Sequence, residues 1–276
     1  MSTKKITEII QKLTDHQNIT ITERGDVAIA SALCAVEKGT ILIPEEGGWL
    51  SYKKLPQKLG LKSQIVKCHL AKLNLEDLKK KSKSASALLY QNPGGYFADQ
   101  PMKKIYDICK KNNCLVIMDV SGGIGTDLCD GRYADIMVAS FRKWKLVDAD
   151  VGGFISSNIF DLSKIERLKD KTSLTKILKS FHQLQKRIIY LEEVREKVVF
   201  DLVEYDVVHP EDLGFVVVVN FYEEEEKKYI IKYCKDNELE YTTCPRYIRL
   251  NQDAISIELK RLKAVEKHIK TKSKKK

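Results

Sequence analysis

Short apolar runs separated by amphipathic stretches fill the first half of the chain. Five of these runs are rich in Val, Ile and Leu, and they end at Pro44, Cys68, Tyr90, Asp119 and Ser140. Such runs are typical of the strands of a parallel sheet, because helices cover both faces of that sheet. Apolar residues with helical spacing after Asp26 predict a helix that ends before Gly39, and a second helix is expected from Pro101 to Lys111.

The second half of the chain has a different pattern. A long basic amphipathic stretch from about Asp161 to Phe200 lacks glycine and proline, which predicts one or two helices. The residues after this stretch indicate a small α+β region. We expect a strand in the apolar run Phe215 to Phe221, a helix through Glu223 to Asn237, a strand at Y-I-R-L ending at Leu250, and a final helix. We therefore predict an α/β protein with a three-layer, mostly parallel sheet and a small C-terminal α+β domain. The expected parts are a large domain with its connecting helices at 1–200, the small domain at 201–270 and a disordered lysine-rich tail at 271–276.

The charge and the cysteines narrow the class of protein. The formal net charge is +10, but five of the positive charges belong to the tail from Lys270 to Lys276, so the folded body is only mildly basic. Nucleic acid, tRNA included, is therefore a less favoured partner than a small molecule. Neither a long apolar span nor a signal-peptide core occurs, so we expect a cytoplasmic protein outside the membrane. The seven cysteines form no C-x-x-C pair, which indicates buried thiols and neither disulfides nor a metal site.

Polar and glycine-rich segments follow four consecutive predicted strands. They are E-E-G-G-W-L-S-Y after Pro44, Q-N-P-G-G-Y after Tyr90, D-V-S-G-G after Met118, and S-F-R-K-W-K-L-V-D-A-D-V-G-G after Ala139. Sheets of this type bind ligands beyond the carboxyl ends of their strands. The chemistry of the protein is therefore expected at this edge.

The last of these segments carries a specific resemblance. The string A-D-I-M-V-A-S-F-R-K-W-K-L-V-D-A-D-V-G-G-F-I resembles the cofactor-lysine segment of the DegT/DnrJ/EryC1/StrS group within the pyridoxal-phosphate (PLP)-dependent fold-type I aminotransferases, where S-F-x-x-x-K precedes G-G and a strand. The resemblance implies PLP as the cofactor, Lys145 as its Schiff-base lysine and Asp119 as the partner of its pyridine nitrogen. Its further implied cofactor contacts are Gly25, Asp26 and Val27 at a phosphate turn, Trp49 on the ring face, Asn92 toward the phenolic oxygen, and Ser140 and Arg142 near the phosphate.

These roles agree with elementary chemistry. A carboxylate beside the ring nitrogen keeps that nitrogen protonated, so that PLP accepts electrons from a carbanion, and Asp119 is such a group. An amine must be uncharged to form an imine, and a partly desolvated lysine beside a cation loses its proton more easily, which suits Lys145. The helix start at Gly25 offers free N–H groups to a phosphate.

Two assignments stay open at this stage. Lys143 competes with Lys145 as the cofactor lysine, because cysteine desulfurases have the shorter spacing S-x-x-K. In the small domain, C-P-R-Y-I-R-L-N resembles the strand where many fold-type I enzymes bind the substrate carboxylate, and it implies Arg249 first and Arg246 second.

The expected function is that of a PLP-dependent aminotransferase-like enzyme. It would act at the α-carbon of an amino acid or amino sugar, as a homodimer with a small-molecule amino donor and acceptor, while Lys145 binds the cofactor and moves the α-proton. One alternative is PLP-dependent sulfur or selenium transfer or aminoacyl-tRNA modification, because K-L-V-D-A-D-V-G-G also resembles selenocysteine-synthase-like archaeal proteins. Another is a non-catalytic fold-type I relative that acts as a binding protein.

Overall fold

A seven-stranded sheet forms the centre of the protein in the computed structural model, which describes residues 2–36 and 39–263. Its strand order is β1-β9-β8-β7-β6-β2-β3. The strands are β1 (Asn18–Thr22), β2 (Thr40–Pro44), β3 (Lys62–Val66), β6 (Ala87–Gln91), β7 (Leu115–Asp119), β8 (Ile136–Ser140) and β9 (Gly153–Ser157). Strands β3, β2, β6, β7 and β8 run parallel, while β9 and β1 pair antiparallel at one edge. The predicted α/β class with a mostly parallel sheet is confirmed.

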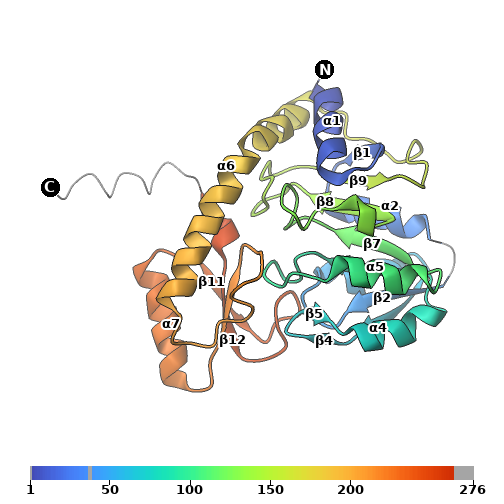
Figure 1. Cartoon of the computed structure of the whole chain (residues 1–276). Helices are drawn as coiled ribbons and strands as arrows, with labels where there is room; N and C mark the ends of the chain where they lie inside the picture. The colour runs from blue at the N-terminus through green and yellow to red at the C-terminus, as the bar shows by residue number, and fades with distance from the viewer. Residues whose placement is uncertain (1, 37–38, 264–276) are drawn as a thin grey trace.

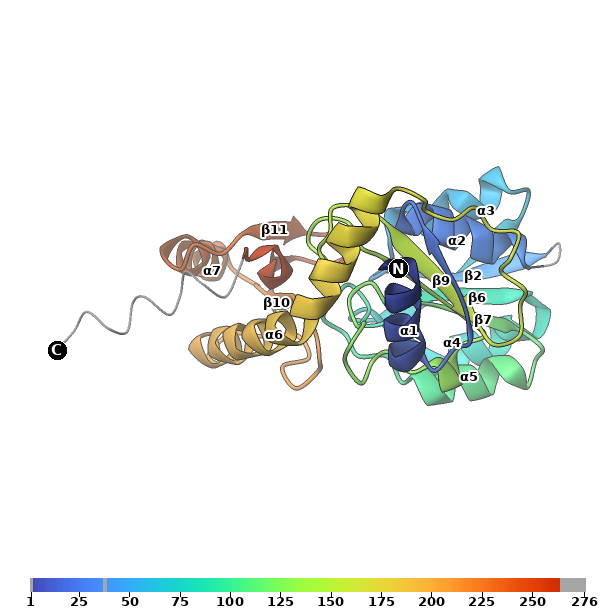
Figure 2. The ribbon, with the colours of Figure 1, turned by 90° about the horizontal axis from the view of Figure 1, so that it is seen from above.

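Helices cover both faces of this sheet. Side chains that alternate along a strand enter different cores: Ile41 and Ile43 pack with α2 (Gly25–Cys34), while Leu42 joins the core on the opposite face. Figure 2 shows α2 and α3 (Leu55–Lys58) on one side of the sheet, and α1 (Ser2–Thr14), α4 (Leu75–Lys81) and α5 (Met102–Lys110) on the other. Burial on both faces explains why the strand sequences are almost entirely apolar.

One long helix connects the central sheet to the C-terminal part (Figure 1). Helix α6 (Lys171–Asp201) begins where the Asp170 side chain accepts a hydrogen bond from the Ser173 N–H at 2.7 Å. Its first half packs Ile177 and Phe181 into the core of the large sheet, and its end places Val198 in the core of the C-terminal part. The helix therefore belongs to both parts.

The C-terminal part is a small three-stranded sheet with one helix against it. Strands β10 (Val217–Asn220), β12 (Ala254–Ile257) and β11 (Tyr241–Cys244) pair antiparallel in that order, and α7 (Glu224–Asp236) packs on them. The expected strand Y-I-R-L is wrong, because Tyr247–Leu250 lies in the turn between β11 and β12. After this turn the described residues form β12 and the 3-10 turn η4 (Leu259–Arg261), while residues 264–270, where an expected final helix could lie, and the tail at 271–276 lie outside the described residues.

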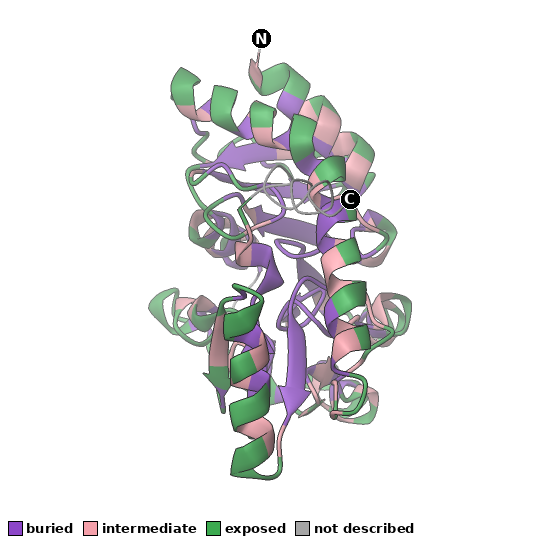
Figure 3. Ribbon diagram, turned by 90° about the vertical axis from the view of Figure 1, so that its left-hand side faces the viewer, coloured by how far each residue is buried: buried purple, intermediate pink, exposed green. Residues whose placement is uncertain are grey.

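Short elements complete the chain. They are η1 (Leu50–Lys53), β4 (Cys68–His69), β5 (Lys72–Leu73), η2 (Ser82–Ser84) and η3 (Gly131–Tyr133). Figure 3 shows that burial is concentrated in the strands, whereas the outer faces of α6 and α7 are exposed. Within residues 2–36 and 39–263, no helix is both long enough and apolar enough to cross a membrane.

Candidate active site

A cavity of about 400 Å³ lies at the carboxyl ends of β7 and β8, between the start of α2 and residues of the C-terminal part. Of the residues predicted from the sequence, it is lined by Gly25, Asp26, Trp49, Asp119, Ser140, Arg142, Lys143, Lys145, Arg246 and Arg249. Val27 and Asn92 do not line it. Segments from seven separate places in the chain therefore converge on one space, as expected for this edge of such a sheet.

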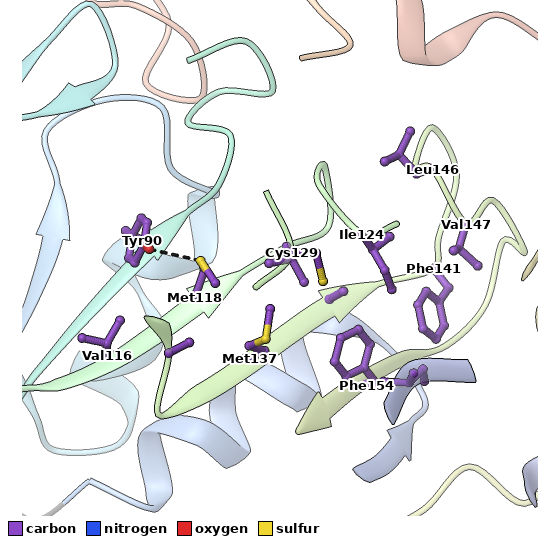
Figure 4. Packing of buried hydrophobic residues seen from close by; sticks show 14 of the residues in the cluster. Tyr90, Val116, Met118, Ile124, Cys129, Met137, Phe141, Leu146, Val147 and Phe154 are labelled. Atoms are coloured by element: carbon purple, nitrogen blue, oxygen red, sulfur yellow. Dashed lines mark hydrogen bonds between the residues drawn. The ribbon is translucent and has the colours of Figure 1, made fainter. Parts of the chain in front are cut away.

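Lys145 comes from the loop between β8 and β9, which is anchored on both sides of the lysine. Its neighbours Leu146 and Val147 are buried, and Figure 4 shows them with Phe141 and Phe154 in the core cluster. The Lys145 amine donates a hydrogen bond to the Tyr96 hydroxyl and lies 5.3 Å from the centre of the Trp49 ring. The anchored loop thus holds this amine against two aromatic rings of the cavity.

Lys143 has different surroundings. Its side chain is 66% exposed, and its amine lies 3.7 Å from the Asp150 carboxylate. The Lys143 side chain thus faces water and a counter-ion, whereas the Lys145 amine is held against the aromatic rings of the cavity. The environment of the two lysines therefore favours Lys145.

Asp119 ends β7 and is buried. Its carboxylate accepts hydrogen bonds from the Tyr52 hydroxyl at 2.8 Å and from the Ser121 N–H at 2.9 Å. Burial and the nearby Asp119 charge raise the pKa of Tyr52 well above its ordinary value, so the phenol stays protonated and acts as a donor. One donor on each oxygen orients the carboxylate and leaves each oxygen with further accepting capacity toward the cavity.

The N-terminus of α2 faces the cavity beside the end of β8. This helix has no side-chain cap; the Val27 and Ala28 N–H groups donate to the Arg24 carbonyl, and the Asp26 N–H at the cavity is open to a ligand. A Cβ atom at Gly25 would lie 2.6 Å from the Ser140 Cβ, so only glycine leaves room here. The Asp26 carboxylate is turned toward the Trp49 indole N–H, which donates to it at 3.2 Å.

Strand β6 supplies Gln91 to the cavity in place of the predicted Asn92. The buried Asn92 amide donates to the Leu128 carbonyl and accepts from the Gln100 N–H, so it fastens the following loop. Side chains alternate along a strand, and the neighbour Gln91 therefore points to the cavity. The Gln91 side-chain nitrogen is buried and has no hydrogen-bond partner within the described residues. An unpaired buried donor of this kind is typical of a ligand site.

The C-terminal part provides the opposite wall through a buried ion cluster. The Arg249 guanidinium donates to both Glu258 oxygens at 2.7 Å, and the side chains are 2% and 1% exposed. Lys260 places its amine 2.9 Å from the same carboxylate. Burial would raise the pKa of Glu258, but the charges of Arg249 and Lys260 hold that pKa well below its ordinary range.

The two predicted substrate arginines thus differ in availability. Most of the Arg249 donors are already used by Glu258, Ser256 and the Ile248 carbonyl. Arg246 is exposed, and its guanidinium has no hydrogen-bond or ion-pair partner within residues 2–36 and 39–263. Arg249 is thus held in a structural ion pair, whereas the Arg246 guanidinium is open to the cavity.

Sequence reasoning missed Gln91, Tyr96 and Lys260, which line the cavity, and Tyr52 and Glu258, which support it. Gln91 and Tyr96 are the first and last residues of Q-N-P-G-G-Y, so the strand-end rule contained a signal for both. Tyr52 closes E-E-G-G-W-L-S-Y in the same way. Glu258 and Lys260 follow no motif, and nothing local in the sequence indicates that they meet Arg249.

One family profile matches part of the chain. Residues 166–273 match the family described as "MJ1341 family C-terminal domain", a range that includes α6 with the small sheet. The division predicted from the sequence, at residue 200, instead places this helix in the large domain. A comparison with curated proteins gives no match.

Solved structures match nearly the whole chain. A proposed sugar aminotransferase from Streptococcus pneumoniae, in its PLP form, has a TM-score of 0.74 at 10% identity, over 94% of this chain and 86% of that one. A serine palmitoyltransferase from Sphingomonas wittichii gives 0.67 at 14% over 93% and 70%, and an apo cysteine desulfurase from Thermococcus onnurineus gives 0.65 at 14% over 93% and 78%. This chain therefore shares the fold of PLP-dependent fold-type I enzymes.

Proposed function

We propose that the protein is a PLP-dependent transferase, aminotransferase-like, that acts at the α-carbon of an amino acid or amino sugar. The single observation that carries the proposal is that Lys145 from the β8–β9 loop and Asp119 from the end of β7 line the same cavity as the start of α2, which has no side-chain cap. The fold likeness to PLP-dependent enzymes agrees with it.

The residues present fit this cofactor. Gly25 and Ser140 leave a cradle beside the N-terminus of α2, which is suited to a phosphate, and Arg142 lines the same region. The buried, unpaired Gln91 nitrogen is a donor that suits an oxygen on the cofactor ring. Gln91 thus takes the role that the sequence assigned to Asn92.

PLP supplies an electron sink that stabilises negative charge at the substrate α-carbon. In this chain Lys145 would hold the cofactor covalently, and its amine, once released, would move the proton at the α-carbon. Asp119, oriented by Tyr52, would keep the ring nitrogen protonated. Trp49 and Tyr96 would shield this space from water, since both line the cavity.

The substrate carboxylate would bind to an arginine of the C-terminal wall. Arg246 is the freer of the two candidates, and Arg249 would contribute mainly through its charge. A guanidinium suits this role because its N–H groups match both oxygens of a carboxylate.

The homodimer also remains a proposal. Trp49, Leu50 and Trp144 line the cavity and are 36%, 50% and 43% exposed, which is much for such large apolar side chains. A second copy of the chain would cover them. Sedimentation velocity of the protein and of Leu50→Asp would test this, with a dimer expected only for the former.

The cofactor proposal is tested by the absorbance spectrum with added PLP, before and after borohydride reduction. We expect an absorbance band near the visible edge, and borohydride reduction should attach the absorbing group covalently to the protein. Lys143→Ala should retain this band, and Lys145→Ala should abolish it. Loss in Lys143→Ala alone would give the role to Lys143. No band in the wild type would exclude the enzyme and favour a binding protein that retains the fold.

Sulfur or selenium transfer is the competing reaction. Within the described residues, no cysteine lines the cavity, and Cys34 is the exposed cysteine. A persulfide on any cysteine after incubation with PLP and L-cysteine would favour sulfur transfer over transamination.

A further inference from the structure

A second lysine lies in the cavity beside Lys145. Lys260 is 6% exposed, lines the cavity, and places its amine 5.0 Å from the centre of the Tyr96 ring. The Lys145 amine lies 4.7 Å from the centre of the same ring. Two amines from opposite walls thus contact one aromatic side chain.

The backbone of Lys260 is held firmly, so its side chain has a defined direction. The Lys260 N–H donates to the Phe215 carbonyl at 2.9 Å, and its carbonyl accepts from the Arg187 guanidinium of α6 at 2.7 Å. Both backbone groups are therefore used by the scaffold, and the side chain is directed toward the cavity.

The charges around Lys260 explain what it can do. Glu258 is shared by the two buried cations Arg249 and Lys260, so one buried negative charge faces two positive ones. Arg261 approaches Glu258 to 3.6 Å but has its own counter-ion in Glu240 at 2.8 Å. A guanidinium does not lose its proton in proteins. Lys260 is therefore the member of this cluster that releases a proton most easily, and the neutral amine leaves behind a complete Arg249–Glu258 pair.

The groups that face Lys260 from the other elements add to this effect. The β8–β9 loop contributes the positive charge of Lys145 and the ring of Trp144, and the β6–α5 loop contributes the phenol of Tyr96. Burial, the largest cause, lowers the pKa of Lys260, the charges of Arg249 and Lys145 lower it as well, and Glu258 raises it; together they bring this pKa to about 7. Close to neutral pH the cavity therefore contains an amine that both accepts and returns protons.

We propose that Lys260 is the base that accepts a proton from an incoming substrate ammonium, so that the substrate nitrogen becomes able to attack. An N–H bond of the substrate breaks, an N–H bond forms at Lys260 Nζ, and the new ammonium stands beside Glu258; no oxidant or reductant takes part. The inference rests on the proposed function, because it assumes a primary amine substrate.

The first test measures the pKa of the Lys260 amine in the protein without cofactor. In a pH titration of ¹³Cε-lysine NMR signals, we expect one signal to titrate near the value of about 7 and to vanish in Lys260→Arg, while surface lysines titrate near their ordinary value of about 10.4. If the signal assigned to Lys260 titrates with those of the surface lysines, the proposal is overturned. This test holds whether or not the protein binds PLP.

The second test measures whether Lys260 acts as a base toward an incoming amine. With PLP bound, release of the cofactor from Lys145 is followed by absorbance near neutral pH with two probes: methylamine, which arrives as an ammonium, and methoxyamine, which arrives neutral. We expect Lys260→Met and Lys260→Arg to slow methylamine about 100-fold and methoxyamine little, in line with the loss of a general base. Lys235→Met, an exposed lysine of α7, is the matched control and should react like the wild type with both.

The outcomes separate the two proposals. Equal slowing of both probes, or rescue of methylamine by Lys260→Arg, would show a structural or charge role and overturn the base. A wild type without a PLP band would overturn the proposed function, and with it the role of Lys260 toward an amine substrate, while the NMR titration still decides the charge of Lys260.

Discussion

The two walls of the cavity are built on different principles. The wall from the large sheet consists of Asp119 at the end of β7, Gly25 at the start of α2 and Lys145 in the β8–β9 loop. The wall from the C-terminal part consists of a buried ion cluster in which Arg249, Glu258 and Lys260 hold one another. In the first wall, backbone geometry positions the groups that would contact a ligand; in the second, ion pairs between buried side chains do so. Substitutions in the two walls should therefore reduce stability for different physical reasons.

The largest effect is expected at Glu258. Glu258→Gln leaves two buried cations without their counter-ion, which should cost about 3–5 kcal/mol of unfolding free energy. Urea unfolding at neutral pH measures this loss. Because the folded-state pKa of Glu258 is lowered, the stabilisation by its charge is complete above the unfolded value of about 4.3 and is lost as the pH falls below it.

The matched control is Glu240→Gln. The Glu240 side chain is 60% exposed, and it pairs with Arg261 at 2.8 Å. An exposed pair contributes little, so the loss should stay below about 1 kcal/mol. Similar losses of unfolding free energy in Glu240→Gln and Glu258→Gln would contradict the view that the ion pairs of the second wall stabilise the protein because they are buried.

On the first wall the largest loss should come from Tyr52→Phe. The variant removes the hydroxyl that donates to Asp119 at 2.8 Å and leaves a buried carboxylate with one donor fewer, at about 1.5–3 kcal/mol. Both urea unfolding and PLP titration should report it. Tyr106→Phe is the control, because its hydroxyl lies 3.5 Å from Asp135, at the limit of a hydrogen bond; an equal loss there would argue against a special role of Tyr52.

Gly25→Ala should act by crowding. The added Cβ would meet the Ser140 Cβ at 2.6 Å, which we expect to cost about 1–3 kcal/mol and to weaken PLP binding. The second-site change Ser140→Gly removes that atom. Recovery of stability in the double variant, measured as a double-mutant cycle, is the expected result, and strict additivity would contradict the crowding.

The smallest effect is expected at the start of α6, the helix that joins the two parts. Asp170→Ala removes the side chain that accepts from the Ser173 N–H and should cost about 1 kcal/mol in thermal or urea unfolding. Asp170→Asn keeps an acceptor oxygen and should lose clearly less. If Asp170→Ala lost as much unfolding free energy as Glu258→Gln, the stability of both parts would depend on the start of α6, against this expectation.

The first wall was predictable to a large extent from local patterns. Apolar runs that end at Pro44, Asp119 and Ser140 became β2, β7 and β8 with these end residues, and the polar segments after them meet at the cavity. The exception is Asn92. An error of one residue at a strand end moves a side chain to the other face, and Gln91 therefore stands where Asn92 was expected.

The second wall was predicted poorly, for an identifiable reason. Y-I-R-L has the composition of a strand, yet Tyr247–Leu250 forms a turn in which Arg249 is buried by its pairing with Glu258. A buried arginine needs a partner, and no rule of periodicity indicates which carboxylate it will find. Strands β11 and β12 on either side of the turn are short and were missed.

By itself, the sequence determined the α/β class, the strand ends and the segments that carry Lys145 and Asp119, because these depend on apolar periodicity and on glycine-rich turns next to it. Only the tertiary structure decided that Tyr52 orients Asp119, that Asn92 points away, and that Lys260 shares Glu258 with Arg249. These contacts depend on which side chains become buried together. Burial sets the strength of every charge and hydrogen bond, and it is a property of the packed chain as a whole.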